Sequence, residues 1–202
     1  MTKRTTRNMQ RSVLMAAIFS LSLLTCFGLP SNTGSMVAMY ARQGTPQEIV
    51  GQLAELAATR EVFTLTPATA QQKLGKFAKL EVRKDPESPA LQRLIGSNPD
   101  SGILWIAAYF EPSKASSKFR EVTFAFAPGD GGADKLYKDF KAVLAPRLAN
   151  LGKQEQETET YGAIWHIKPR YTVTLQKDDY AINPLTEKEQ QAVTVHMNVD
   201  QD

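Results

Sequence analysis

The sequence predicts an α+β fold, a mostly antiparallel β-sheet with an amphipathic helix over residues 133–151 packed on one face and short helices on its N-terminal side. Three observations lead to this class. Several segments alternate apolar and polar residues, which is typical of half-buried strands. Residues 133–151 carry apolar side chains at helical spacing. Two threonine–proline pairs, at 45–46 and 66–67, have the form of helix starts.

Three short helices are expected before the main helix. Residues 45–48 read Thr-Pro-Gln-Glu, a capping box with proline at the first helical position, and apolar residues at helical spacing continue to about Arg60. The second threonine–proline pair predicts a helix over 66–75, with glycine as its stop. A serine–proline pair predicts a third helix over 88–96.

Six segments are expected to form strands. Five of them alternate in polarity, whereas residues 103–110 are apolar on both faces, which predicts a central strand covered on both sides. Asp178 and Asp179 are interpreted as a turn. The six segments are residues 77–83, 103–110, 119–127, 163–168, 170–176 and 192–199. The residues expected to point inward are Ala78, Leu80, Val82, Val122, Phe124, Phe126, Tyr171, Val173, Leu175, Val193, Val195, Met197 and Val199.

One compact α+β domain is expected over residues 45–202, with two small subdomains meeting near 128–132 as the alternative. Residues 31–44 are interpreted as a flexible spacer. A faint internal repeat is visible in the sequence. A helix that ends in Leu-Gly-Lys, at 74–76 and again at 151–153, is followed each time by a strand with a tryptophan, and this similarity reflects either a duplication or chance. The layout resembles that of small bacterial envelope lipoproteins, in which helices pack on one face of a small antiparallel sheet. The resemblance covers the layout and no motif, so no residue role follows from it.

The first 30 residues predict an export signal. A basic start is followed by an apolar run from Val13 to Leu29 and by the helix breaker Pro30. The run also approaches the roughly 17–20 residues that span a bilayer, so a retained anchor is the rival interpretation. Cys26 is therefore part of a cleaved signal, a lipidation site that tethers the protein to a membrane, or one residue of a retained span. The protein is expected to be periplasmic, secreted or membrane-tethered on the outer side of the inner membrane.

The charge distribution argues against a nucleic-acid-binding protein. The chain has 24 Lys and Arg against 21 Asp and Glu, but five of the basic residues and none of the acidic ones precede residue 46. The remainder has 19 basic and 21 acidic residues and offers no basic patch. Because Cys26 is the one cysteine, the exported part has no disulfide and depends on its core for stability.

The candidate binding residues lie on the polar faces of the last three strands. Alternation places both histidines of the chain on these faces, and pairing of the strands could bring them onto one open sheet face. Such a pair could form a metal site or a proton-transfer site. No third residue stands at a spacing typical of a metal ligand, so no metal or cofactor is expected. A solvated sheet face is the simpler interpretation. The candidate residues are His166, Lys168, Thr172, Thr174, His196 and Asn198.

Three functions remain open on the sequence alone. The first is a non-enzymatic envelope protein that binds another protein or a small ligand, because no catalytic constellation stands out. The second is a secreted or periplasmic hydrolase that uses His166 or His196 with a carboxylate brought close by folding. The third is an inhibitor or immunity-type protein against an exported partner. Histidines that converge in a cleft beside an acid such as Asp130, Asp178 or Asp179 would favour the hydrolase.

Overall fold

The computed structural model describes residues 44–84, 91–111, 119–155, 162–167 and 169–199. The expected export signal with Cys26, the spacer up to residue 43, and Lys168 lie outside the described residues. In the part of the chain that the structure describes, no helix is long and apolar enough to cross a membrane.

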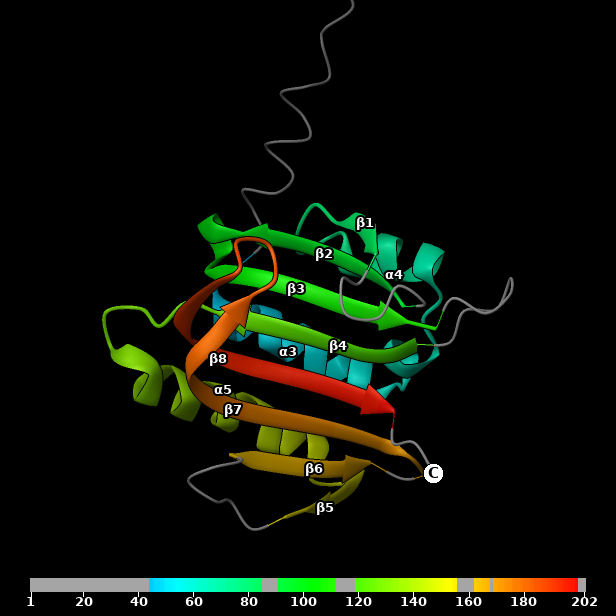
Figure 1. The fold of residues 1–202 in the computed structure, drawn as a ribbon. Helices are drawn as coiled ribbons and strands as arrows, with labels where there is room; N and C mark the ends of the chain where they lie inside the picture. Colours follow the sequence, from blue (N-terminus) through cyan, green and yellow to red (C-terminus); the bar gives the residue numbers. More distant parts are fainter. Residues whose placement is uncertain (1–43, 85–90, 112–118, 156–161, 168, 200–202) are drawn as a thin grey trace, which may run out of the picture. The chain divides into compact units, whose positions relative to one another are not determined.

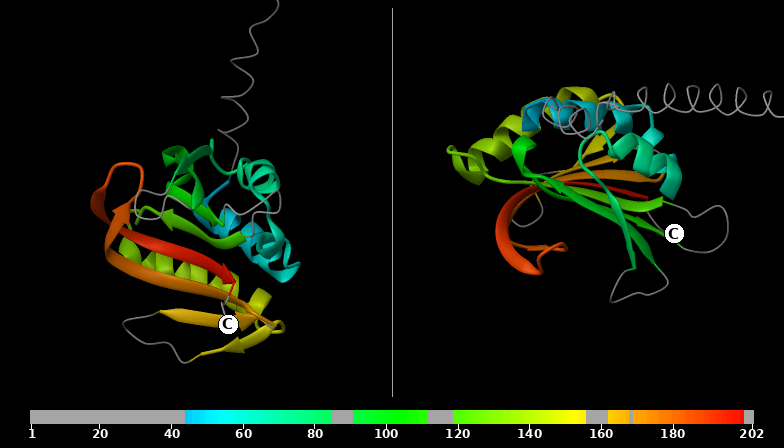
Figure 2. Two further views of the ribbon diagram at one scale, coloured as in Figure 1. Left: turned by 45° about the vertical axis from the view of Figure 1, so that its right-hand side comes forward. Right: turned by 90° about the horizontal axis from the view of Figure 1, so that it is seen from above.

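Within these residues, eight antiparallel strands form a sheet in the order β1-β2-β3-β4-β8-β7-β6-β5 (Figure 1). The strands are β1 (Glu81–Lys84), β2 (Gln92–Asn98), β3 (Ile103–Phe110), β4 (Phe119–Phe126), β5 (Gly152–Gln154), β6 (Ala163–Ile167), β7 (Tyr171–Asn183) and β8 (Lys188–Val199). The helices are α3 (Pro46–Ala58), η1 (Glu61–Thr64), α4 (Pro67–Leu74), η2 (Pro99–Ser101) and α5 (Gly132–Leu148). The three α-helices lie on one face of the sheet (Figure 2), and α5 contacts β7 and β8. The predicted α+β class is confirmed.

Two capping boxes start α3 and α4, at the two helix starts that were predicted; the box itself was predicted only at Thr45. The Thr45 hydroxyl accepts a hydrogen bond from the Glu48 N–H at 3.4 Å, and the Glu48 carboxylate accepts one from the Thr45 N–H at 2.7 Å. A reciprocal pair of the same kind precedes α4. The main helix ends at Leu148, before the predicted end at 151, because Gly152 already pairs with Ile167 as the first residue of β5.

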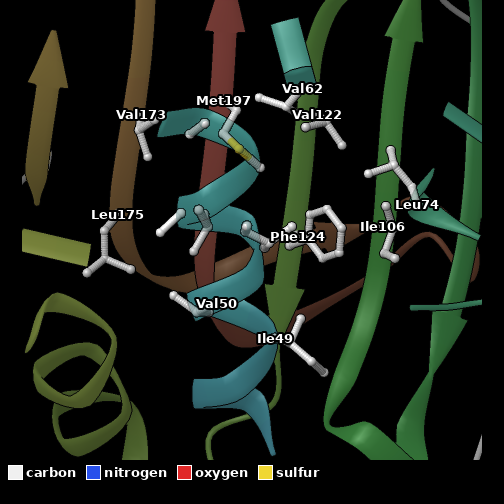
Figure 3. Packing of buried hydrophobic residues seen from close by; sticks show 14 of the residues in the cluster. Ile49, Val50, Val62, Leu74, Ile106, Val122, Phe124, Val173, Leu175 and Met197 are labelled. Atoms are coloured by element: carbon white, nitrogen blue, oxygen red, sulfur yellow. The ribbon is translucent and has the colours of Figure 1, made fainter. Parts of the chain in front are cut away.

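The main core lies between the helices and the sheet (Figure 3). Val50 of α3 and Phe124 of β4 are both fully buried there. Phe63 of η1 stacks on Tyr171 of β7, with 4.1 Å between the ring centroids. The central strand residues predicted to point inward are buried in this core, namely Val122, Phe124, Phe126, Val173, Leu175, Val193, Val195 and Met197.

The helix predicted over residues 88–96 is wrong. Residues 92–98 form β2 instead, and residues 85–90 are not described. Leu94 and Ile95 point to opposite faces of β2 and are 2% and 0% exposed, so this apolar run belongs to a strand covered on both sides. Short apolar runs do not distinguish a buried strand from a helix, which explains the error.

The strand predicted over residues 77–83 is wrong in its first half. Only Glu81–Lys84 join the sheet, and all four side chains are exposed. Val82 lies on the helix-covered side but at the outermost strand, and it is 59% exposed. Phe77 is buried in the connection before β1, where the side-chain amide of Asn98 donates a hydrogen bond to its carbonyl at 2.9 Å.

The turn predicted at Asp178 and Asp179 is also wrong. The β7–β8 ladder continues until Asn183 pairs with Lys188, and a bulge lies between Asp178 and Ala181. The bulge lets the hairpin curl over the sheet face opposite the helices (Figure 2). A second apolar cluster of Trp105, Ala107, Ala125, Ala181 and Ala192 forms there. This cluster explains why residues 103–110 are apolar on both faces.

The order of elements repeats along the described chain. α4 with β1–β4 and α5 with β5–β8 are each a helix followed by a four-stranded antiparallel meander, and the two units meet where β4 pairs with β8. The tryptophans do not correspond, since Trp105 lies in the third strand of its unit and Trp165 in the second strand of the other. The repeat is therefore one of topology and does not follow the sequence match.

Candidate binding face

The sheet face opposite the helices, here called the open face, carries the candidate residues and is turned toward the viewer in Figure 1. His166 pairs with Thr172, which in turn pairs with Asn198, and His196 pairs with Thr174. Directly opposed residues of antiparallel strands project to the same side of a sheet. The structure therefore brings five of the six candidate residues onto one face, from β6, β7 and β8. The sixth, Lys168, lies outside the described residues.

Strand β4 adds two polar residues to this face. Glu121 pairs with Asn198, and Thr123 pairs with His196. Two polar rows therefore run across neighbouring strands, at right angles to the chain direction. Thr123 and Thr172 are only 6% and 8% exposed, so parts of the rows are buried although no helix covers them.

His196 is the centre of a hydrogen-bonded group, here called the His196 cluster, that also contains Glu121, Thr123 and Thr194. The Thr123 hydroxyl donates to the Glu121 Oε1 at 2.8 Å. The His196 Nδ1 lies 2.9 Å from the Thr123 Oγ1 and 3.2 Å from the Glu121 Oε1. The His196 Nε2 lies 3.0 Å from the Thr194 Oγ1. Both ring nitrogens have partners, which fixes the orientation of the imidazole on the open face.

The cluster also sets the charge at the centre of the open face. The pKa of Glu121 lies below its ordinary value, first because His196 hydrogen-bonds to the carboxylate. The hydrogen bond from Thr123 and the charge of His196 lower this pKa further, while burial opposes them. Glu121 is therefore ionised at neutral pH, in a position where its carboxylate is accessible to a partner.

His166 belongs to a separate pair. Its Nε2 lies 2.9 Å from the Glu155 Oε1, and both side chains are about half exposed. Strand β7 separates β6 from β8, so the two histidines are about 10 Å apart across the strands and do not converge. Among the described residues, no group of three or more His, Cys, Asp or Glu side chains is placed to hold a metal ion.

The role of the open face has to be inferred from its own chemistry. No family model, curated protein or solved structure matches the chain. The hydrogen bonds from Thr194 to His196 to Glu121 follow the order of a nucleophile, a base and an orienting acid. Thr194 is 2% exposed, however, so its hydroxyl holds the ring in place and is not accessible to a substrate.

A groove of about 890 Å³ lies elsewhere, between the starts of α3 and α5. Its walls are drawn from residues 44–48, 100–102 and 127–139, and they include Asp130. None of the five described candidate residues lines it. A ligand of the open face would therefore lie on the sheet surface and not in this groove.

Sequence reasoning missed Glu121 and Thr123 as members of the site. The signal was present, because the apolar alternation in residues 119–127 places both on the polar side of that strand. Their meeting with His196 depends on the pairing of β4 with β8, which no local pattern reveals. The acids expected near the histidines were Asp130, Asp178 and Asp179, whereas Glu121 and Glu155 occupy those places.

Proposed function

We propose that the protein is exported and binds a protein partner in the cell envelope through the open face, with no catalytic step of its own. The observation that carries this proposal is the pair of polar rows on a sheet face that the helices leave uncovered. Non-obligate protein interfaces are about as polar as the rest of a protein surface, and such rows fit them. The basic and apolar composition of residues 1–30 supports export.

The rigidity of the open face favours binding. Its residues lie on strands that the sheet ladder holds in place, and the His196 cluster fixes one ring by hydrogen bonds. A pre-organised surface loses less conformational entropy when a partner binds. The hairpin that curls over this face also carries exposed apolar side chains. Tyr180 is 75% exposed and Ile182 is 64% exposed, and they add apolar area of the kind that anchors interfaces.

A photo-crosslinking amino acid at Thr174, in the middle of the open face, tests the proposal in cells that produce the full chain. The matched control carries the same amino acid at Lys138, which is exposed on α5. We expect a discrete adduct with one envelope protein from position 174 and none from position 138. Adducts from position 138 alone, or an adduct with a lipid or small metabolite instead of a protein, would contradict the proposal.

A hydrolase that uses His196 is the second candidate, because the ring contacts both a carboxylate and a hydroxyl. The burial of Thr194 counts against it. The strand position of Thr194 does too, because β8 pairs on both sides and its N–H groups serve the ladder instead of an oxyanion. Equal rates of ester hydrolysis by the wild type and by His196→Ala would exclude this candidate, whereas a large loss in the variant would support it.

An inhibitor or immunity-type protein is a special case of the binding proposal. Its partner would be an exported toxin, and the identity of the protein crosslinked to position 174 distinguishes this case from the others.

A further inference from the structure

Strand β1 forms one outer edge of the sheet, and its side chains are unusually accessible. All four residues, Glu81–Lys84, are exposed. Within the described residues β1 pairs with β2 alone, so its outward N–H and C=O groups face away from the ladder. Such an edge can accept another strand.

The sequence of β1 is complementary to itself when two copies run antiparallel about Val82. Val82 then faces Val82 of the second copy, and each Glu81 faces an Arg83. Opposite charges directly across an antiparallel pair stabilise it, and the contact is isologous, as a two-fold axis requires. Glu81 and Arg83 lie on one face of β1 and Val82 on the other, so this register keeps the helices of both copies on the same side.

The two neighbouring antiparallel registers, which also keep the helices of both copies on the same side, are unfavourable. A pair centred on Glu81 would place two carboxylates together, and one centred on Arg83 would place two guanidinium groups together. On the opposite edge, β5 centred on Lys153 would oppose two lysines, and centred on Gln154 it would oppose Lys153 to Glu155, whose Oε1 already lies 2.9 Å from the His166 Nε2. What distinguishes β1 is that its charge-complementary register also places an exposed apolar side chain, Val82, against its own copy.

In the single chain, the charged and apolar side chains of β1 are exposed to solvent, and pairing with a second copy would partly bury them. In the single chain the Arg83 Nη2 lies 3.3 Å from the Glu81 Oε2, with both side chains about half exposed, so they neutralise each other in solvent. Val82 is one of the large apolar side chains that the described residues leave exposed. It pairs with Leu94, which belongs to the main core. A second Val82 beside it would extend that core across the edge.

We propose that β1 pairs with β1 of a second copy of this chain, centred on Val82, to form a two-fold dimer with one sheet continuous across both copies. The open faces of the two copies would then lie side by side and facing the same way. The proposal rests on the edge strand alone and does not depend on the function proposed for the open face.

The test uses complementary charge reversals in the full chain, purified in mild detergent and followed by sedimentation velocity over a range of concentrations. Arg83→Glu leaves only acids at the two paired positions, and Glu81→Arg leaves only bases. We expect a concentration-dependent dimer for the wild type and a dimer dissociation constant at least about tenfold higher for each single reversal, because two attractive pairs become repulsive. An equal mixture of the two variants should restore dimers, since each strand then meets its opposite.

Two controls keep the outcomes separate. Lys153→Glu on β5 should leave the wild-type sedimentation unchanged, and the circular dichroism of each variant should match that of the wild type. A wild type that stays monomeric at every concentration would overturn the proposal. Single reversals that dimerise like the wild type, or a mixture that stays monomeric when the wild type dimerises, would overturn it too.

Discussion

The substitution Thr194→Val tests whether the His196 cluster is an organised part of the fold. It replaces a buried hydroxyl by a methyl group of similar volume and removes the 3.0 Å hydrogen bond to the His196 Nε2. A hydrogen bond contributes about 0.5–1.5 kcal/mol net, and the ring is 26% exposed, so water can partly replace the lost partner. We expect the free energy of unfolding to fall by about 1 kcal/mol, or Tm by about 2–4 °C for a chain of this size.

A double-mutant cycle separates this hydrogen bond from other effects. Thr194→Val, His196→Ala and the double variant are unfolded in urea, and we expect a coupling energy of about 1 kcal/mol. Thr174→Val is the matched control, because Thr174 lies opposite His196 on the same face but the structure gives it no hydrogen bond to the ring. A coupling near zero for Thr194, or an equal coupling for Thr174, would refute the interpretation of the cluster.

Three further predictions concern pH, the core and the glycine that precedes β6. Because the pKa of Glu121 is lowered in the folded chain, its ionisation stabilises the fold above the ordinary value of 4.5, and this contribution is lost as the pH falls through the lower folded value. The wild type should therefore lose more stability than Glu121→Gln between about pH 6 and pH 3 in urea unfolding, and parallel losses would contradict this. Phe124→Ala removes a fully buried ring that lies 5.5 Å from the ring of Phe77, and it should cost about 3–5 kcal/mol in thermal or urea unfolding. Gly162→Ala should cost more than about 1 kcal/mol in the same assay, because φ is +67° and a Cβ there would lie 2.1 Å from the Leu175 carbonyl oxygen.

The elements that local chemistry defines could be predicted from the sequence. The threonine–proline pairs at 45–46 and 66–67 predicted two helix starts, and the alternation in residues 119–127 and 192–199 identified the inward residues of β4 and β8. The failures have tertiary causes. β2 is covered on both sides and therefore has no alternation, and the hairpin continues past Asp178 because a bulge absorbs the residues that resembled a turn.

The candidate site shows the same division. The polar sides of β4, β6, β7 and β8 could be predicted, and His166, Thr172 and His196 lie on one face as the alternation suggested. The order of strands in the sheet could not be predicted. That order places β7 between the two histidines, and it brings Glu121 to His196 from a strand about 75 residues earlier. The sequence therefore predicted that the candidate residues share one sheet face, but it did not predict the hydrogen-bonded His196 cluster.

Histidine footprinting in the envelope tests the central claim, binding at the open face, most directly. His166 and His196 are the two histidines of the chain, and both lie on that face, 45% and 26% exposed. Diethyl pyrocarbonate modifies accessible imidazoles, so mass spectrometry of the two peptides reports on this face alone. If a partner covers the face, both histidines should be modified less in intact envelopes than in the purified protein, and Thr174→Arg should remove the difference. Equal modification in envelopes and in the purified protein would show an open face that no partner covers and would contradict the claim.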